Sequence, residues 1–166
     1  MMEANESTPL SAAEQMFVQY SAQLAEAVDA VLVDWVCNSV TDRATSAGLS
    51  LDQAQLERAA LAGEQCRLDI SVKMRALLQA DLDAQQGSPL SLLRSSTGYA
   101  TAVLQSAGVP EVQRDEFEQR AFPEDVYGLA PASFSDVDER LSEPGLEWGA
   151  AKAHLHLLRR RNAGQR

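Results

Sequence analysis

Two histidines near the C-terminus are the side chains of this sequence best suited to acid–base chemistry or metal binding. His154 and His156 are separated by one leucine. On a β-strand this spacing would place both rings on one side, whereas on an α-helix it places them about 200° apart around the axis. The sequence predicts a helix here, so we expect the rings to face different directions and not to bind one metal ion. No metal and no cofactor is expected.

A run of carboxylates between residues 114 and 127 is the second candidate for chemistry. Paired carboxylates act as general acid and base when burial separates their pKa values. Here Asp115, Glu116 and Glu118 lie beside Arg114 and Arg120. Mixed charges on a short helix favour the simpler interpretation, a solvent-exposed face that carries ion pairs.

A small-molecule pocket, in a binding protein or an enzyme, stays open as an alternative for these residues. It would lie between the last helix and residues 111–134. Its polar groups would come from Glu116, Tyr127, Trp148, His154 or His156. The sequence contains no Gly-x-x-x-x-Gly-Lys-[Ser/Thr], Gly-x-Gly-x-x-Gly, Gly-x-Ser-x-Gly, His-Glu-x-x-His or Cys-x-x-Cys motif. We therefore assign no catalytic residue.

Aromatic side chains in the C-terminal half are candidates for contact with a partner. In an irregular segment such rings either cover the end of the core or anchor another protein. Core packing is the more common role, and partner contact is the alternative. The residues predicted to contact a partner are Phe117, Phe122, Tyr127 and Trp148.

Four main helices must position these residues, and they are predicted over residues 11–45, 50–86, 88–108 and 143–161. In the first, apolar residues recur at steps of three and four. Ser50 and Gln53 form a capping box for the second, and Ser88 with Pro89 opens the third. The glycines expected to end the first three helices are Gly48, Gly87 and Gly108.

The predicted inner faces follow from the same spacing. In the second helix we expect an inner face of Leu56, Ala60, Gly63, Cys66, Ile70, Met74 and Leu77. In the last helix we expect an inner face of Leu146, Gly149, Ala150, Ala153, Leu157 and Leu158. Small residues at 145, 149 and 153 would allow a close helix crossing, either inside the bundle or across a dimer.

Three prolines, at positions 123, 131 and 144, exclude one long helix before the last one. Short helices are predicted over 111–121 and 135–141, the second capped by Ser135 and Asp138. The fold class is therefore all-α, a bundle of four main helices with a proline-interrupted segment before the last. Residues 11–161 are predicted to form one domain between flexible tails at 1–10 and 162–166.

The charge distribution limits the classes of partner. The 166-residue chain has a net charge of −10, with 24 acidic and 14 basic residues. An acidic protein repels phosphate backbones and anionic lipid, so nucleic acid and membrane surfaces are disfavoured. The basic cluster Arg159–Arg161 is the exception to this acidic character. We interpret it as the cationic last turn of a helix, and an RNA contact through it is a third, less favoured alternative.

The chain is expected to be cytoplasmic. Its N-terminus is acidic and lacks the pattern of a secretion signal. The longest early apolar run, Ala30–Val33, is far shorter than the roughly 20 residues of a membrane span. Cys37 and Cys66 are then predicted to be reduced thiols that pack on apolar helix faces.

The C-terminal half also carries a family resemblance. It lies in residues 114–117, in 122–129 (Phe-Pro-Glu-Asp-Val-Tyr-Gly-Leu) and in 143–149 (Glu-Pro-Gly-Leu-Glu-Trp-Gly). This part resembles a small all-α family of GC-rich bacteria with no established function. The resemblance implies the fold class and the compartment, and it brings no functional residues with it. The leading hypothesis is a non-enzymatic interaction or regulatory protein. Its partner would be another protein or, as a homodimer, a second copy.

Overall fold

The computed structural model describes residues 9–80, 88–113 and 125–165, and these residues form helices, turns and loops without a strand. Its helices are α1 (Pro9–Ser46), α2 (Gln53–Gln79), α3 (Pro89–Ser95), α4 (Thr97–Ser106), α5 (Phe134–Val137), the 3-10 helix η1 (Glu139–Leu141) and α6 (Ser142–Gly164). The predicted all-α fold is confirmed. None of the described helices is both long and apolar enough to span a membrane.

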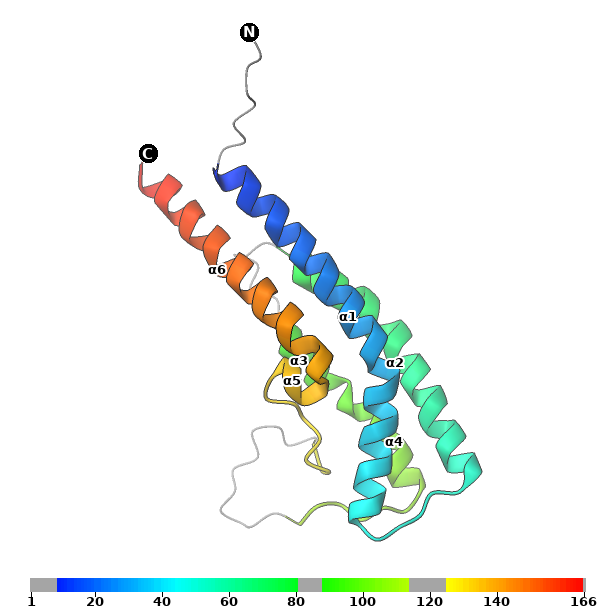
Figure 1. The fold of residues 1–166 in the computed structure, drawn as a ribbon. Coiled ribbons are helices and arrows are strands. Elements are labelled where there is room, and N and C mark those ends of the chain that lie inside the picture. Colours follow the sequence, from blue (N-terminus) through cyan, green and yellow to red (C-terminus); the bar gives the residue numbers. More distant parts are fainter. Residues whose placement is uncertain (1–8, 81–87, 114–124, 166) are drawn as a thin grey trace.

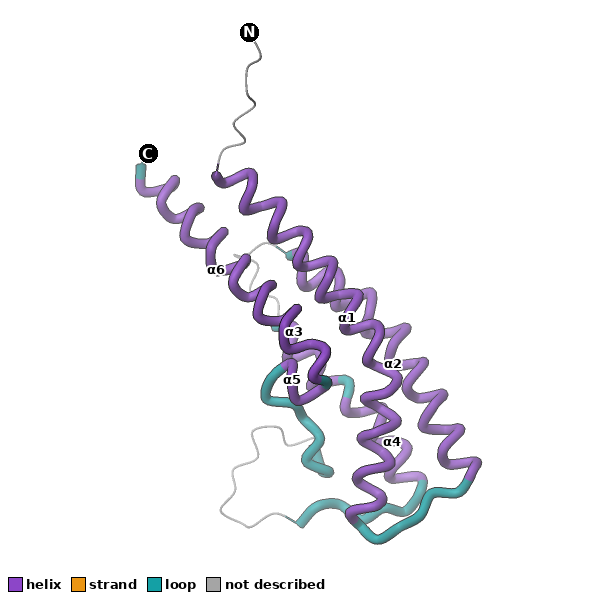
Figure 2. The backbone as a smooth tube through the Cα atoms, in the orientation of Figure 1, coloured by secondary structure: helices purple, strands orange, loops and turns teal. Residues whose placement is uncertain are grey.

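The helices run alternately up and down (Figure 1). α1 is central, and it packs against α2 on one side, α6 on another and α4 near its C-terminal half. α3 and α4 follow one another in the position of the third predicted helix (Figure 2). This arrangement brings α6 back beside α1, so the start of α1 and the end of α6 lie at the same end of the bundle.

α1 buries the stripe that its spacing predicts. Phe17, Leu24, Val28, Val31 and Trp35 are buried, and Tyr20, which the same spacing predicts for this stripe, is half-buried. The helix ends at Ser46, two residues before Gly48, which has a φ of +75°, and the Leu49 N–H donates to the Ala44 carbonyl at 2.9 Å. Glycine adopts this left-handed conformation without steric cost, so the predicted end of the helix is confirmed.

α2 begins two residues later than predicted. Asp52, not Ser50, is the N-cap: its carboxylate accepts from the Gln55 N–H at 2.8 Å, and the Gln55 side chain accepts from the Asp52 N–H at 2.9 Å. The Ser50/Gln53 and Asp52/Gln55 pairs both have the three-residue spacing of a capping box. An ionised carboxylate is the stronger acceptor at the positive end of a helix, which favours Asp52. Leu56 and Ala60 are exposed, and Ala59 takes the predicted inner position.

The third predicted helix is broken at Ser96. Its start is confirmed, because the Ser88 hydroxyl accepts from the Ser91 N–H at 3.1 Å with Pro89 in the first turn. Farther along, the hydroxyls of Ser95 and Ser96 donate to the carbonyls three residues before them, at 2.6 and 2.5 Å. Such side-chain bonds compete with the helical ladder and explain the break.

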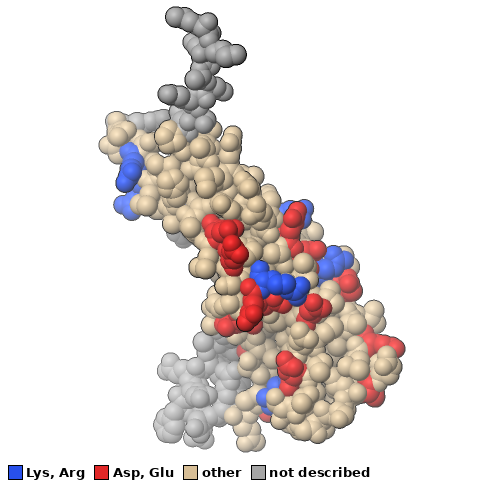
Figure 3. Space-filling view, viewed as in Figure 1, with Lys and Arg blue, Asp and Glu red and all other residues tan. Residues whose placement is uncertain are grey.

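The segment before α6 differs in detail from its prediction. Residues 111–113 are not helical, and the rest of the predicted helix 111–121 lies outside the described residues. α5 is capped by Ser133 and Asp136, and Asp138 caps η1 through the Arg140 N–H at 2.9 Å. Arg140 also pairs with Asp34 of α1 at 3.3 Å. Figure 3 shows acidic and basic side chains mixed on this face of the molecule.

α6 presents a different inner face from the predicted one. Trp148, Ala151 and Leu155 are buried. In contrast Leu146, Ala150, Ala153 and Leu157 are exposed, with Leu146 at 73%. The predicted inner face was wrong because the indole of Trp148 buries more area than the small residues, and it fixes the rotation of the helix.

Candidate functional site

Two of the residues predicted to contact a partner lie in the core. Tyr127 is 3% exposed and donates its hydroxyl to the Val109 carbonyl at 2.8 Å. Trp148 is 8% exposed, and its Nε1 donates to the Ser21 hydroxyl at 3.2 Å. Side chains with so little surface do not anchor a partner in this conformation, so the core role applies to both.

The other predicted site residues do not converge in the described structure. Phe117, Phe122 and Glu116 lie outside the described residues. Both histidines of α6 are exposed, and His154 lines a groove of about 380 Å³ between α1 and α6. Within the described ranges no three His, Cys, Asp or Glu side chains gather as metal ligands would.

The two cysteines are not activated as nucleophiles. Cys66 is fully buried, and burial is the main cause that raises its pKa to about 11. Burial, followed by the Asp34 carboxylate, also raises the pKa of the half-buried Cys37. Since the thiolate is the nucleophilic form, neither residue is activated at neutral pH.

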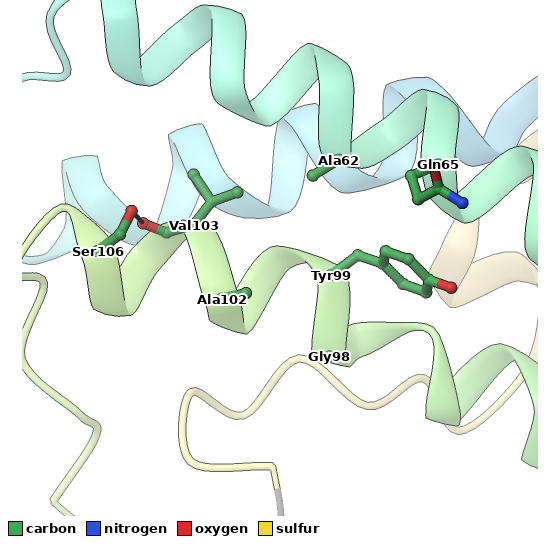
Figure 4. A pocket seen from close by; sticks show the side chains of 7 residues that line it. All are labelled: Ala62, Gln65, Gly98, Tyr99, Ala102, Val103 and Ser106. Carbon is green, nitrogen blue, oxygen red and sulfur yellow. Dashed lines mark hydrogen bonds between the residues drawn. The ribbon is translucent and has the colours of Figure 1, made fainter.

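A groove between α2 and α4 is the first part of the candidate site (Figure 4). Its volume is about 380 Å³. The residues that line it are Ala62, Gln65, Gly98, Tyr99, Ala102, Val103 and Ser106. Most of these side chains are small, so the groove is open to solvent, and Figure 4 shows Ala62 and Gln65 of α2 directed toward α4.

The polar groups in this groove are already hydrogen-bonded. The Tyr99 hydroxyl donates to one carboxylate oxygen of Asp69 at 2.5 Å, and the Gln65 amide donates to the other at 3.0 Å. These bonds, the Tyr99 bond first, lower the pKa of Asp69, and the Asp69 carboxylate raises the pKa of Tyr99 to about 12. The Tyr99 hydroxyl and both oxygens of Asp69 therefore have partners within the groove itself.

Exposed aliphatic side chains on α2 form the second part of the site. Leu61 is 70% exposed, Leu68 57% and Val72 74%. Together with Gln65 they occupy positions i, i+4, i+7 and i+11 of one helix face, which we name the α2 stripe. Gln65 belongs to both features, so the α2 stripe borders the groove, and together they form the α2–α4 face.

The α2–α4 face includes a helix, α2, that carries less negative charge than α1. α2 has three acidic and four basic residues, whereas α1 has five acidic residues and one arginine. The chain as a whole carries −10. Another acidic polypeptide therefore meets less repulsion at α2 than at α1.

A polar pocket of about 370 Å³ lies between α3, α4 and residues 125–130. Its two charged side chains hold the neighbouring loop: Arg94 donates to the Pro131 carbonyl at 3.0 Å, and Asp125 accepts from the Leu129 and Ala130 N–H groups at 2.8 and 2.7 Å. These bonds fix the backbone of residues 125–131 against α3. The pocket does not involve α6, so it differs from the pocket predicted from the sequence.

Known proteins give no further guide to this surface. Comparison of the chain with protein-family models, curated proteins and solved structures found no match.

The α2 stripe was not predicted from the sequence, because only one apolar face was expected for the second helix. Leu61, Leu68 and Val72 lie roughly 120–160° around the helix from the buried Cys66, so they form a second face. A search for apolar residues at i, i+7 and i+11 on the polar side of each helix would have found it.

The unusual pKa values predict that stability falls in alkaline solution. Cys66 and Tyr99 both hold their protons more tightly in the folded chain, with pKa values raised from 9.0 to about 11 and from 10.0 to about 12. Their contribution is complete below pH 9 and is lost as the pH rises through the range from 9 to about 12. For Cys66 it amounts to up to about 3 kcal/mol.

Urea unfolding across this range should show the decline. In a Tyr99→Phe variant the part of this decline at the higher pH values should be absent. A free energy of unfolding that stays constant across the range would contradict the prediction.

Proposed function

We propose that the protein is a non-enzymatic interaction module that binds an amphipathic helix of another polypeptide on its α2–α4 face. The observation that carries the proposal is the α2 stripe of Leu61, Leu68 and Val72, exposed beside the apolar groove between α2 and α4. Apolar side chains grouped in this way mark interaction sites more often than scattered ones do.

The spacing of the α2 stripe supports a helix as the bound element. Positions i, i+4, i+7 and i+11 repeat the seam of a coiled coil, in which each side chain enters a gap between residues of a facing helix. The small side chains of Ala62, Ala102 and Ser106 leave room for large apolar residues of the incoming helix. The hydrogen bonds of Asp69 to Tyr99 and Gln65 support the contact, since the Tyr99 hydroxyl and both Asp69 oxygens keep these partners when the groove is covered.

The small-molecule alternative has weaker support. The polar pocket beside α3 is the best candidate for it, but Arg94 and Asp125 are engaged with the backbone of residues 129–131. A ligand would have to replace or share those bonds.

Site-specific photo-crosslinking in cells tests the proposal. A benzophenone side chain at position 68 should give one adduct of discrete mass, and peptide mapping should place the adduct in a helical segment. Adding Val72→Glu should abolish the adduct, because the glutamate would be desolvated in the contact. The matched control is a benzophenone at position 146, which is 73% exposed on α6. Equal yields at 68 and 146, or no adduct at 68, would overturn the proposal.

A further inference from the structure

We infer that the helix bound on the α2–α4 face is α2 of a second copy of this chain, held antiparallel about a twofold axis. The inference rests on the proposed function and names the partner. Its basis is a charge pattern on α2 that is complementary to itself when the helix is reversed.

Glu57 and Arg75 give this pattern. Both are exposed, and they are 18 residues apart, which is five full turns of helix, so they lie on the same side of α2. Each is nine residues from Cys66, at opposite ends of the α2 stripe. When two α2 helices pair antiparallel with Cys66 at their common midpoint, Glu57 faces the partner's Arg75, and Arg75 faces the partner's Glu57.

The α2 stripe has nearly the same midpoint. In that antiparallel arrangement Leu61 lies within one residue of the partner's Val72, and Gln65 lies within one residue of the partner's Leu68. A parallel pair in register would instead bring Glu57 level with the partner's Glu57 along the axis, and Arg75 level with the partner's Arg75. Like charges in register are repulsive, so the sequence of α2 favours the antiparallel orientation.

The total charge also selects this helix as the contact between two copies. Two chains of −10 repel each other, and the repulsion is least where the local charge is balanced. α2 carries three acidic and four basic residues. Two α1 helices, each with five acidic residues and one arginine, would add repulsion at the contact.

The size of the surface predicts a weak to moderate dimer. α2 is about 40 Å long, and a strip about 10 Å wide along it gives roughly 400 Å² per copy. Specific complexes bury about 800 Å² per partner, so the α4 side of the groove must contribute. The dimer is therefore expected to depend on protein concentration in the micromolar range.

Charge reversal at the two ends of the α2 stripe tests the inference. Sedimentation velocity over a concentration series should show a monomer–dimer equilibrium for the unmodified chain. Glu57→Arg and Arg75→Glu should each raise the dissociation constant roughly tenfold or more, because each replaces two attractive contacts by two repulsive ones. An equimolar mixture of the two variants should recover the dimer, since the arginine introduced in one variant then faces the glutamate introduced in the other.

Two controls and the contrary results complete the test. Leu68→Glu should abolish the dimer and Leu146→Glu should leave it unchanged, with helical circular dichroism retained in both because the sites are exposed. A dimer that survives Leu68→Glu, or a mixture that stays monomeric, overturns the inference. A monomer at every concentration, with a crosslinked adduct of a different protein at position 68, overturns the second copy but leaves the proposed function standing. Absence of any adduct overturns both.

Discussion

Trp148→Ala is expected to destabilise the fold by about 3–5 kcal/mol, through loss of buried aromatic area and the cavity that remains. The indole joins three helices. Its Nε1 donates to the Ser21 hydroxyl at 3.2 Å, and that hydroxyl donates to the Leu78 carbonyl at 3.0 Å. Its ring lies 6.4 Å from the Phe17 ring, centroid to centroid. Thermal unfolding should show a melting temperature lower by roughly 6–20 °C.

Two further substitutions separate the role of the ring from that of the helix. Trp148→Phe keeps most of the apolar contact and loses the N–H bond, so its cost should be clearly smaller. Leu157→Ala removes an exposed side chain of the same helix and should change stability by less than about 0.5 kcal/mol. If Trp148→Ala retains the stability of the unmodified chain and loses only a binding activity, the indole is a partner contact and its core role is wrong.

Gly63→Leu is expected to destabilise by about 3 kcal/mol, because α1 and α2 touch at this glycine. A Cβ there would lie 3.0 Å from the Val33 carbonyl oxygen and 3.1 Å from its Cα. The obstacle is the backbone of α1, which yields only if the helices separate. Separation would also stretch the contacts of Asp29 with Ser71 and Arg67, now 2.6 and 3.4 Å.

Gly149→Leu is the matched control. It lies inside α6, and a Cβ there meets no atom within 4 Å. Leucine has the better helix propensity by roughly 0.8 kcal/mol, so this variant should be as stable as the unmodified chain or slightly more stable. Urea unfolding of both variants checks the pair, and an equal effect at the two positions would contradict the close packing of α1 on α2.

Helix starts, helix ends and buried stripes were predictable from the sequence where one pattern had no competitor. The apolar stripe of α1 follows one periodicity, and five of its six predicted residues are buried, with Tyr20 half-buried. Ser88 followed by Pro89 marks a helix start by two independent effects, the side-chain cap and the fixed φ of proline. The glycine ends at Gly48 and Gly108 were predictable because other residues meet a steric cost at their φ of +75° and +73°.

Errors arose where two patterns of similar quality competed. Ser50/Gln53 and Asp52/Gln55 both fit a capping box, and the sequence alone does not measure the bonds that decide between them. In α6 the spacing of small and aliphatic residues suggested one face, but the area of Trp148 determined another. Hydroxyl bonds at Ser95 and Ser96 broke a helix that no glycine or proline interrupts.

The candidate site was less predictable than the fold. Buried and exposed aromatics have the same sequence signature, so Tyr127 and Trp148 could be assigned to the core only from their surroundings. The α2 stripe follows from spacing, but the apolar groove beside it depends on how α4 packs on α2. The break at Ser96 helps to determine that packing, and the sequence did not predict it.

Thiol labelling in cells that produce the protein measures whether another chain covers the α2–α4 face. Leu68→Cys would be introduced together with Cys37→Ser, and the buried thiol of Cys66 stays unreactive. If a bound helix covers position 68, a membrane-permeant maleimide should label it several-fold more slowly than position 146 in a matched Leu146→Cys variant. After purification and dilution, which dissociates a weak complex, the two rates should become equal. Equal rates inside the cell would mean that the face is uncovered and would contradict the account.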